Sequence, residues 1–228
     1  MTSSVAQELI DKTFRELAEA EKPAARSRIS NTHNGYIFLI TWSNAHLLRF
    51  CVRLFTGSLS RSEHRLKAQL DDAARSVIAN IEEGFGRPTT REYLNFLGYS
   101  QASLIEVKGD IERSRQDGFL KSVRGSSLAG FRINLADWHE ALRKSVISRP
   151  VENRGIYGNL GEIKGQNQVP LKSFKFLYSP VDNLRVNDLT YEIFIELINK
   201  TDWHLRRLVM SLESKQDRDK VKIAWGQR

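Results

Sequence analysis

The sequence predicts an all-α protein, an up-and-down four-helix bundle with an additional helix and a long loop inserted before the last helix. Two observations predict this fold. Apolar residues recur at helical spacing in four long segments, over 35–56, 61–83, 89–115 and 188–215. Between the third and the fourth segment, the chain becomes rich in Gly, Pro, Asn and Ser and loses any sustained period.

The predicted bundle lies between an N-terminal extension that carries a short helix and a charged tail that we expect to fray. An insertion separates its third and fourth helices. The predicted parts are an extension over 1–32, a bundle over 33–215, an insertion over 116–187 with a helix at 126–147 and a loop at 148–186, and a tail over 216–228.

The first long helix is predicted over 35–56. Its start, YIFLIT, is aromatic and β-branched, and by itself it would also suit a strand. A helix is favoured because the apolar spacing continues through Leu48 and Val52 to Phe55, which is longer than a typical strand.

The second and third helices are predicted to form a hairpin. Val77 and Ile81 continue the apolar face of the second helix. Gly84 is expected to end this helix with a positive φ angle, which glycine adopts without strain. Thr89 is expected to cap the third helix, with Glu92 as its capping-box partner three residues on.

The later elements have weaker signals. The third helix is expected to end at Gly118, and the inserted helix has Trp138 on its apolar face. The segment FKFLY at 174–178 suits a short extended piece within the loop. The last helix is expected to begin with Asp188 as its N-cap.

Composition limits the classes of protein to consider. The chain has 228 residues, of which 40% are hydrophobic and 27% charged, which suits a globular protein with a sizeable core. No apolar run approaches the ~20 residues that cross a bilayer, and the start lacks the pattern of a secretory signal. The single cysteine, Cys51, excludes a disulfide framework within one chain. We therefore expect a cytoplasmic protein without membrane contact.

The net charge of +8 favours an acidic partner such as nucleic acid. The basic residues are not collected in one block, so a basic protein that binds no specific anion is an equally open interpretation. Eight of these residues are candidate contacts to RNA or DNA phosphates: Arg61, Arg65, Arg113, Arg115, Arg143, Lys144, Arg206 and Arg207. Lys164, Lys172 and Lys175 in the loop are further candidates.

A run of motif residues crosses the predicted hairpin. It reads Gln-Leu, Ser, Asn-Ile-Glu-Glu-Gly, Gly-Arg, Glu-Tyr, Phe-Leu and a Ser-x-x-Glu turn of helix. The run resembles the motif of the four-helix-bundle family named after the ribosomal-RNA intervening-sequence proteins, to which the accessory variability determinant of diversity-generating retroelements is related. The resemblance covers roughly 35–120 well and 188–215 moderately. Its motif residues are Gln69, Ser76, Asn80, Glu83, Gly84, Arg87, Glu92, Ser103 and Glu106.

The resemblance implies a ring-like homopentamer with basic surfaces. Some relatives are implicated in binding nucleic acid and a reverse transcriptase. This chain departs from the family pattern at three places. Asp71 and Asp72 stand where many members have basic residues, so this surface is expected to be less basic here. Glu82 replaces a motif alanine and Ala102 a motif glycine, and a helix tolerates both changes.

The polar motif residues Asn80, Glu83 and Glu106 have two interpretations. They could form a site, or Asn80 and Glu83 could satisfy the helix ends around Gly84, and we favour the second interpretation. No catalytic residues, metal site or cofactor is predicted. No histidine has an acidic residue three positions before it, as di-iron bundles require, so surface or edge positions are expected for the histidines. Cys51 is expected to be an inert core residue.

Two functions stay open at this point. The preferred one is a non-enzymatic, oligomeric basic scaffold that contacts nucleic acid through its phosphates. The alternative is a protein–protein interaction module that recruits a partner such as a polymerase or reverse transcriptase, with no direct binding of nucleic acid. Trp42, Trp138 and Trp203 are expected to pack within the protein rather than to stack on bases.

Overall fold

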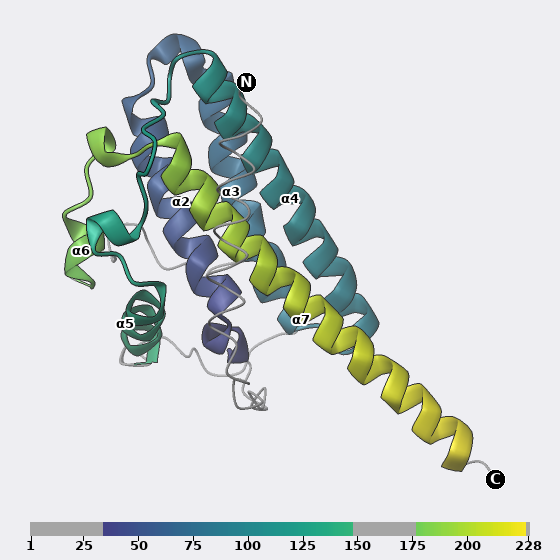
Figure 1. Cartoon of the computed structure of the whole chain (residues 1–228). Helices are drawn as coiled ribbons and strands as arrows, with labels where there is room; N and C mark the ends of the chain where they lie inside the picture. The colour runs from purple at the N-terminus through teal and green to yellow at the C-terminus, as the bar shows by residue number, and fades with distance from the viewer. Residues whose placement is uncertain (1–33, 148–176, 227–228) are drawn as a thin grey trace, which may run out of the picture.

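The computed structural model describes residues 34–147 and 177–226, with side chains through Arg218. Every regular element in these ranges is helical, as predicted. The predicted helix in 1–32 lies outside the described residues, as do most of the loop over 148–186 and of its segment FKFLY. Four long helices run in alternating directions along the chain (Figure 1).

The first two long helices each follow a short 3-10 turn. The turn η1 (Gly35–Phe38) precedes α2 (Ile40–Ser58), and η2 (Arg61–Glu63) precedes α3 (His64–Phe85). The strand that YIFLIT would suit does not form. Trp42, Leu48 and Phe55 are buried along α2, and this burial stabilises the helix.

The hairpin between α3 and α4 (Thr90–Gln116) keeps the predicted cap but not the predicted glycine turn. Thr89 accepts a hydrogen bond from the backbone N–H of Glu92 at 3.2 Å, and its hydroxyl donates to the Glu92 carboxylate at 2.6 Å. Gly84, however, lies within α3, and Gly86 ends the helix at a φ of −77°. The prediction of a positive φ at Gly84 is therefore wrong, since Gly118 and Gly125 are the glycines with positive φ in the described ranges.

Gly84 serves the packing of α3 against α4 instead. A Cβ atom at this position would lie 2.7 Å from Cβ of Phe96 and 2.8 Å from Cδ2 of Tyr93. Such distances are shorter than van der Waals contact, so only glycine lets the two helices approach this closely. Two helical turns before Gly84, the carbonyl oxygen of Val77 accepts a hydrogen bond from the hydroxyl of Ser100 of α4 at 2.8 Å.

The inserted helix is shorter than predicted. The sequence predicts helix over 126–147, but α5 spans Leu135–Ile147, after a 3-10 turn, η3 (Ala129–Phe131). Arg132 has a φ of 58°, which interrupts the helical path, and Asn134 then caps α5 by accepting from the N–H of Ala136 at 2.8 Å. Gly118, with a φ of 80°, follows the end of α4 as predicted.

The last helix, α7 (Tyr191–Gly226), differs from its prediction at both ends. The carboxylate of Asp188 accepts from the N–H of Arg185 at 2.8 Å within η5 (Val186–Asp188), so Asp188 does not cap α7. Thr190 accepts from the N–H of Ile193 at 3.4 Å and takes that role. The helix continues to Gly226, through most of the tail that was expected to fray. A short helix, α6 (Ser179–Asp182), lies in the predicted loop.

The long helices pack in a cycle. The helix α2 contacts α3 and α7, the helix α4 contacts the same two, and α5 lies against α2 (Figure 1). Their facing side chains form one core that includes Trp42, Leu97, Ile111, Trp138 and Phe194. The C-terminal part of α7 runs past the ends of α3 and α4 (Figure 1).

Two buried carboxylates attach the segment after α4 to the start of α7. Glu192 accepts hydrogen bonds from the hydroxyl of Ser122 and, at 2.9 Å, from the N–H of Val123. Glu196 accepts from the N–H of Leu128 at 2.8 Å. Every one of these bonds satisfies a polar group that burial would otherwise leave without water.

Candidate nucleic-acid interface

Most of the predicted phosphate contacts are already paired within their own helices. Arg113 lies 2.7 Å from Asp110, and Arg115 lies 2.5 Å from Glu112. Arg206 of α7 lies 2.8 Å from Asp202, one turn earlier. These pairs offset the positive charges locally, which weakens the field that each arginine presents to a ligand.

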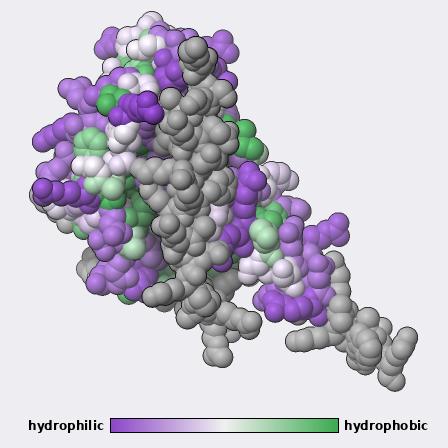
Figure 2. Space-filling view, in the orientation of Figure 1, coloured by the Kyte–Doolittle hydropathy of each residue, from purple (hydrophilic) through white to green (hydrophobic). Residues whose placement is uncertain are grey.

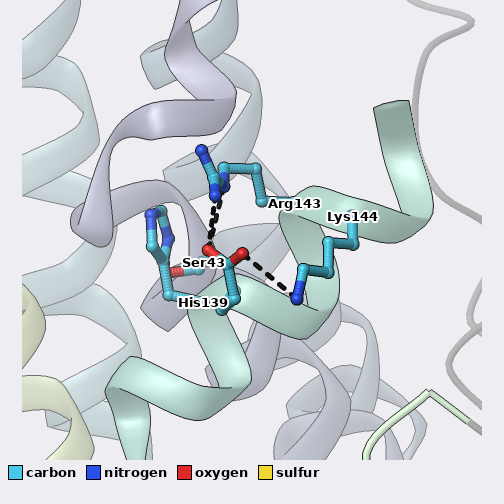
Figure 3. A network of polar contacts seen from close by, with 5 residues as sticks. Ser43, His139, Arg143 and Lys144 are labelled. Atoms are coloured by element: carbon cyan, nitrogen blue, oxygen red, sulfur yellow. Dashed lines mark hydrogen bonds and ion pairs between the residues drawn. The ribbon is translucent and has the colours of Figure 1, made fainter. Parts of the chain in front are cut away.

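The predicted pair Arg143 and Lys144 shares one acidic partner. Their side chains reach from α5 toward the carboxylate of Glu140, at 2.6 and 3.4 Å (Figure 3). On the same helix, Nδ1 of His139 lies 3.0 Å from the hydroxyl of Ser43, which belongs to α2 (Figure 3). An open groove beside them is lined by Asp137, Glu140, Ala141, Lys144, Ser145 and Leu177.

Arg61 and Arg65 differ from the other six predicted residues. Both are exposed, and within the described residues neither has an ion pair or hydrogen bond from its side chain. Arg61 belongs to η2 and Arg65 to the first turn of α3, so both lie at the turn that joins α2 to α3. The structure thus leaves these two guanidinium groups available to a phosphate.

A line of polar side chains, which we name the α2–α3 seam, runs between these two helices. Trp42 donates its indole N–H to the carboxylate of Glu82 at 2.8 Å, and Thr56 donates its hydroxyl to Asp71 at 2.8 Å. Arg53 forms an ion pair with the other oxygen of Asp71. The seam consists of Trp42, His46, Arg49, Arg53 and Thr56 from α2 and of Asp71, Arg75 and Glu82 from α3.

The contacts in the α2–α3 seam show what two departures from the family motif, Asp71 and Glu82, do in the structure. Asp71 does lower the positive charge of this surface, because it pairs with Arg53. Glu82 is more than a tolerated substitution, since it is the interhelical acceptor for Trp42 and its carboxylate lies 3.8 Å from Nε2 of His46.

Three arginines of the seam were missed by reasoning from the sequence. Arg49 and Arg53 are four residues apart on α2, and Arg75 lies across from them on α3. Burial, and then the positive charges of Arg53 and Arg75, lower the pKa of the Arg49 guanidinium. The spacing of Arg49 and Arg53 was visible in the sequence, but their convergence with Arg75 depends on the register of the two helices.

The titratable groups of the core are consistent with an inert interior. Burial raises the pKa of the Cys51 thiol to about 12, in agreement with the prediction that it is unreactive. His46 is fully buried, so the expectation of a surface or edge position is wrong for it, and burial lowers its pKa. Within the described residues, no group of three or more His, Cys, Asp or Glu side chains could hold a metal ion.

The tryptophans pack as predicted at two of three positions. Trp42 and Trp138 are buried, and Trp138 donates to the carbonyl oxygen of Ser43 at 2.7 Å. Trp203 is partly exposed, and the guanidinium of Arg207 lies 4.6 Å from its ring centre. This cation–π contact engages both side chains with one another.

A comparison with protein families finds a match over the region that contains the α3–α4 hairpin. Residues 38–130 match the family model described as 23S rRNA-intervening sequence protein. The match supports the resemblance to that family over this segment. No curated protein and no solved structure matches the chain.

The match to the intervening-sequence family covers α2, α3, α4 and the segment that follows them, and it stops before α5. The resemblance to the family is therefore confirmed, whereas the relationship to the accessory variability determinant stays a prediction. The α2–α3 seam and the turn with Arg61 and Arg65 both lie within the matched segment.

The intervening-sequence motif residues do not gather into one site. Gly84 and Glu92 act in the packing and capping of the hairpin, and Arg87 lies over the ring of Phe96 at 4.3 Å. Glu83 lies 3.9 Å from Arg87 rather than at a helix-end amide. The remaining motif residues, Gln69, Ser76, Asn80, Ser103 and Glu106, are exposed or partly exposed along α3 and α4.

The described surface on the face in Figure 2 is mainly hydrophilic. On the face in Figure 2, its hydrophobic residues appear as small separate groups. None of the described helices combines the length and the apolar character that crossing a membrane requires.

Proposed function

We propose that this protein is a non-enzymatic, basic helical scaffold of the cytoplasm that contacts RNA or DNA through phosphates. The observation that carries this proposal is the pair Arg61 and Arg65, exposed at one end of the molecule and without an acidic partner in the described chain. Unpaired guanidinium groups displace counterions from a nucleic-acid backbone, whereas arginines already paired with carboxylates contribute less.

The cycle of α2, α3, α4 and α7 supports the finer description of the fold as an up-and-down four-helix bundle, with α5 and α6 in an insertion. In such a bundle, the two ends of the helices carry the connections. Arg61 and Arg65 occupy one of these connections.

Binding of a fluorescently labelled RNA and a labelled DNA duplex, measured by anisotropy at increasing salt, tests this proposal. We expect affinity to fall steeply with salt, and the variant with Arg61→Glu and Arg65→Glu to bind about tenfold more weakly or worse. The matched control carries Arg206→Glu and Arg207→Glu, which changes the net charge equally. Equal losses in both variants would show diffuse attraction, and no binding even at low salt would refute the proposal.

One observation favours protein interaction as a second function. Tyr99 and Ile105 of α4 are 58% and 68% exposed, and Gly98 and Ala102 lie between or beside them. Large apolar side chains flanked by small ones suit the approach of another helix. We propose a second copy of the chain as the occupant, in the homopentamer that the family resemblance implies, with a reverse transcriptase as an alternative partner.

Light scattering of the full chain tests this second function. An oligomer that becomes monomeric with Ile105→Glu supports self-association through α4. A wild-type chain that is monomeric at high concentration rules out the second copy as occupant.

A further inference from the structure

Two contacts fix the register of the α2–α3 seam. Thr56 of α2 meets Asp71 of α3 at 2.8 Å, and Trp42 of α2 meets Glu82 of α3 at 2.8 Å. The two helices are antiparallel (Figure 1), so these contacts define the two ends of one shared interface. Residues between the ends that lie on the same helical face as these contacts are therefore opposite one another across the interface.

Arginines occupy the middle of this interface on both helices. Arg49 stands midway between the two end contacts on α2, and Arg75 stands between them on α3. Arg53 is one helical turn from Arg49, on the same face. The register therefore brings three guanidinium groups to one place, a convergence that like-charge repulsion opposes.

The nearby carboxylates, Asp71 and Glu82, offset the charge of this cluster only in part. Both oxygens of Asp71 are in use, one with Arg53 and the other with Thr56. Glu82 lies at the far end of the seam, where it accepts from Trp42. Three guanidinium groups against two carboxylates leave an excess of positive charge in an interface that is partly shielded from water.

The side chain of Arg49 lacks a bond that would hold it in place. Its Nε is buried and has no hydrogen-bond partner among the described residues. An unsatisfied buried donor is costly, and a structural arginine normally satisfies it. Turning this guanidinium toward a ligand would sacrifice no hydrogen bond at Nε.

We propose that Arg49, Arg53 and Arg75 form a binding site for a phosphate group. A phosphate offers several acceptor oxygens and up to two negative charges, and planar guanidinium groups bind it in bidentate fashion. It would offset the excess charge and accept hydrogen bonds from Arg49 and Arg75. It would also compete with Asp71 for Arg53.

The phosphate could belong to a nucleic-acid backbone or to a free phosphate or nucleotide, and the chemistry of recognition is the same. The inference rests on the proposed function only in the first case. In that case, the site lies on the same hairpin as Arg61 and Arg65 and extends their contact along α2 and α3.

Titration of the full chain with inorganic phosphate, followed by NMR of the arginine Nε–H groups at constant ionic strength, tests the site. We expect saturable shifts for the seam arginines. Arg75→Gln should weaken phosphate binding about tenfold, because it removes a charge-assisted contact. Arg75 is exposed, so this variant is expected to fold, and a thermal melt checks that it does.

Two further variants separate a binding site from general positive charge. Arg91→Gln, at an exposed position in the first turn of α4, removes an equal charge and should leave phosphate binding unchanged. Asp71→Asn releases Arg53 from its ion pair and should tighten phosphate binding severalfold. A purely structural role for these arginines would not produce this gain.

Absence of saturable shifts, or equal weakening by Arg75→Gln and Arg91→Gln, would overturn the proposed site. Addition of a short single-stranded RNA then identifies the source of the phosphate. Displacement of bound phosphate by RNA indicates a nucleic-acid backbone, and simultaneous binding of both indicates a free phosphate or nucleotide. RNA binding that depends on Arg61 and Arg65 without phosphate binding at the seam would sustain the proposed function and refute this inference alone.

Discussion

The α2–α3 seam and the start of α7 both place charged groups in the interior, and they satisfy them to different degrees. At α7, Glu192 is 1% exposed and accepts from a hydroxyl and from a backbone N–H. Glu196 accepts from the N–H of Leu128 and pairs with Lys200 at 2.7 Å. In the seam, Arg49 keeps an unsatisfied Nε beside two other arginines.

This difference in hydrogen bonding distinguishes charged groups that stabilise the fold, such as Glu192 and Glu196, from charged groups that are able to bind a ligand, such as Arg49. A buried charge with all its hydrogen bonds made is costly to remove, since its partners are then left unsatisfied. A partly buried charge beside two like charges, with an unsatisfied Nε, contributes little to stability. Its retention in the interface is easier to understand if it binds a ligand.

Of the variants considered, Glu196→Ala is expected to lower the free energy of unfolding the most. It leaves the N–H of Leu128 without an acceptor and Lys200 without its carboxylate, so we expect a loss of about 3 kcal/mol in the free energy of unfolding. Urea denaturation measures this loss. The control is Glu213→Ala, at an exposed position of the same helix, which should change stability little. Similar small effects for both would mean that the α7 carboxylates are not structural.

His204 extends the comparison to the middle of α7. Burial, and then the nearby charges of Arg207, His139 and Lys200, lower its pKa to about 4 from the ordinary 6.5. Between these pH values the unfolded chain binds more protons than the folded chain, so stability falls as the pH drops below 6.5. His204→Gln should reduce the stability difference between pH 7 and pH 5 by about 2 kcal/mol.

Thermal melts at the two pH values measure this difference, with His64→Gln at an exposed position as the matched control. An unchanged pH dependence in the His204 variant would show that burial and the nearby positive charges do not lower the pKa of His204.

Arg49→Met is expected to change the free energy of unfolding the least. It tests most directly whether Arg49 stabilises the α2–α3 seam. Methionine fills much of the same volume without a charge, so we expect a change within about 1 kcal/mol, or a gain in stability. Urea denaturation beside Glu196→Ala makes the comparison direct. A loss as large as that of Glu196→Ala would show that Arg49 holds the fold, and the contrast between the two regions would disappear.

The long helices were predictable because each has its own apolar period, and the Thr89 cap was predictable because capping is local. The start of α7 was not. Asp188 and Thr190 are both good caps in isolation, and the choice between them depends on η5, which uses the Asp188 carboxylate for Arg185. The shortened α5 likewise depends on the left-handed conformation of Arg132, a residue that rarely adopts it.

The candidate site was predictable only in part. A count of basic residues finds Arg61 and Arg65, but it also finds Arg113 and Arg206, whose pairing requires rotamers that only the structure supplies. The α2–α3 seam was hidden for a different reason. From the sequence, Asp71 was interpreted as a loss of positive charge and Glu82 as a tolerated replacement of alanine. In the structure, these two residues mark the ends of an interface whose middle carries the arginines.

Gly84 has a consequence for which substitutions the hairpin can accept. At a glycine that turns the chain, asparagine is the usual replacement, because it tolerates the left-handed conformation. At Gly84 the backbone is helical and the limit is space, so asparagine has no advantage and even the methyl group of alanine meets Phe96 and Tyr93. The nearest atom is the Cβ of Phe96, which every residue except glycine carries, so a smaller side chain at that position would not make room. Change at Gly84 therefore requires a wider spacing between α3 and α4.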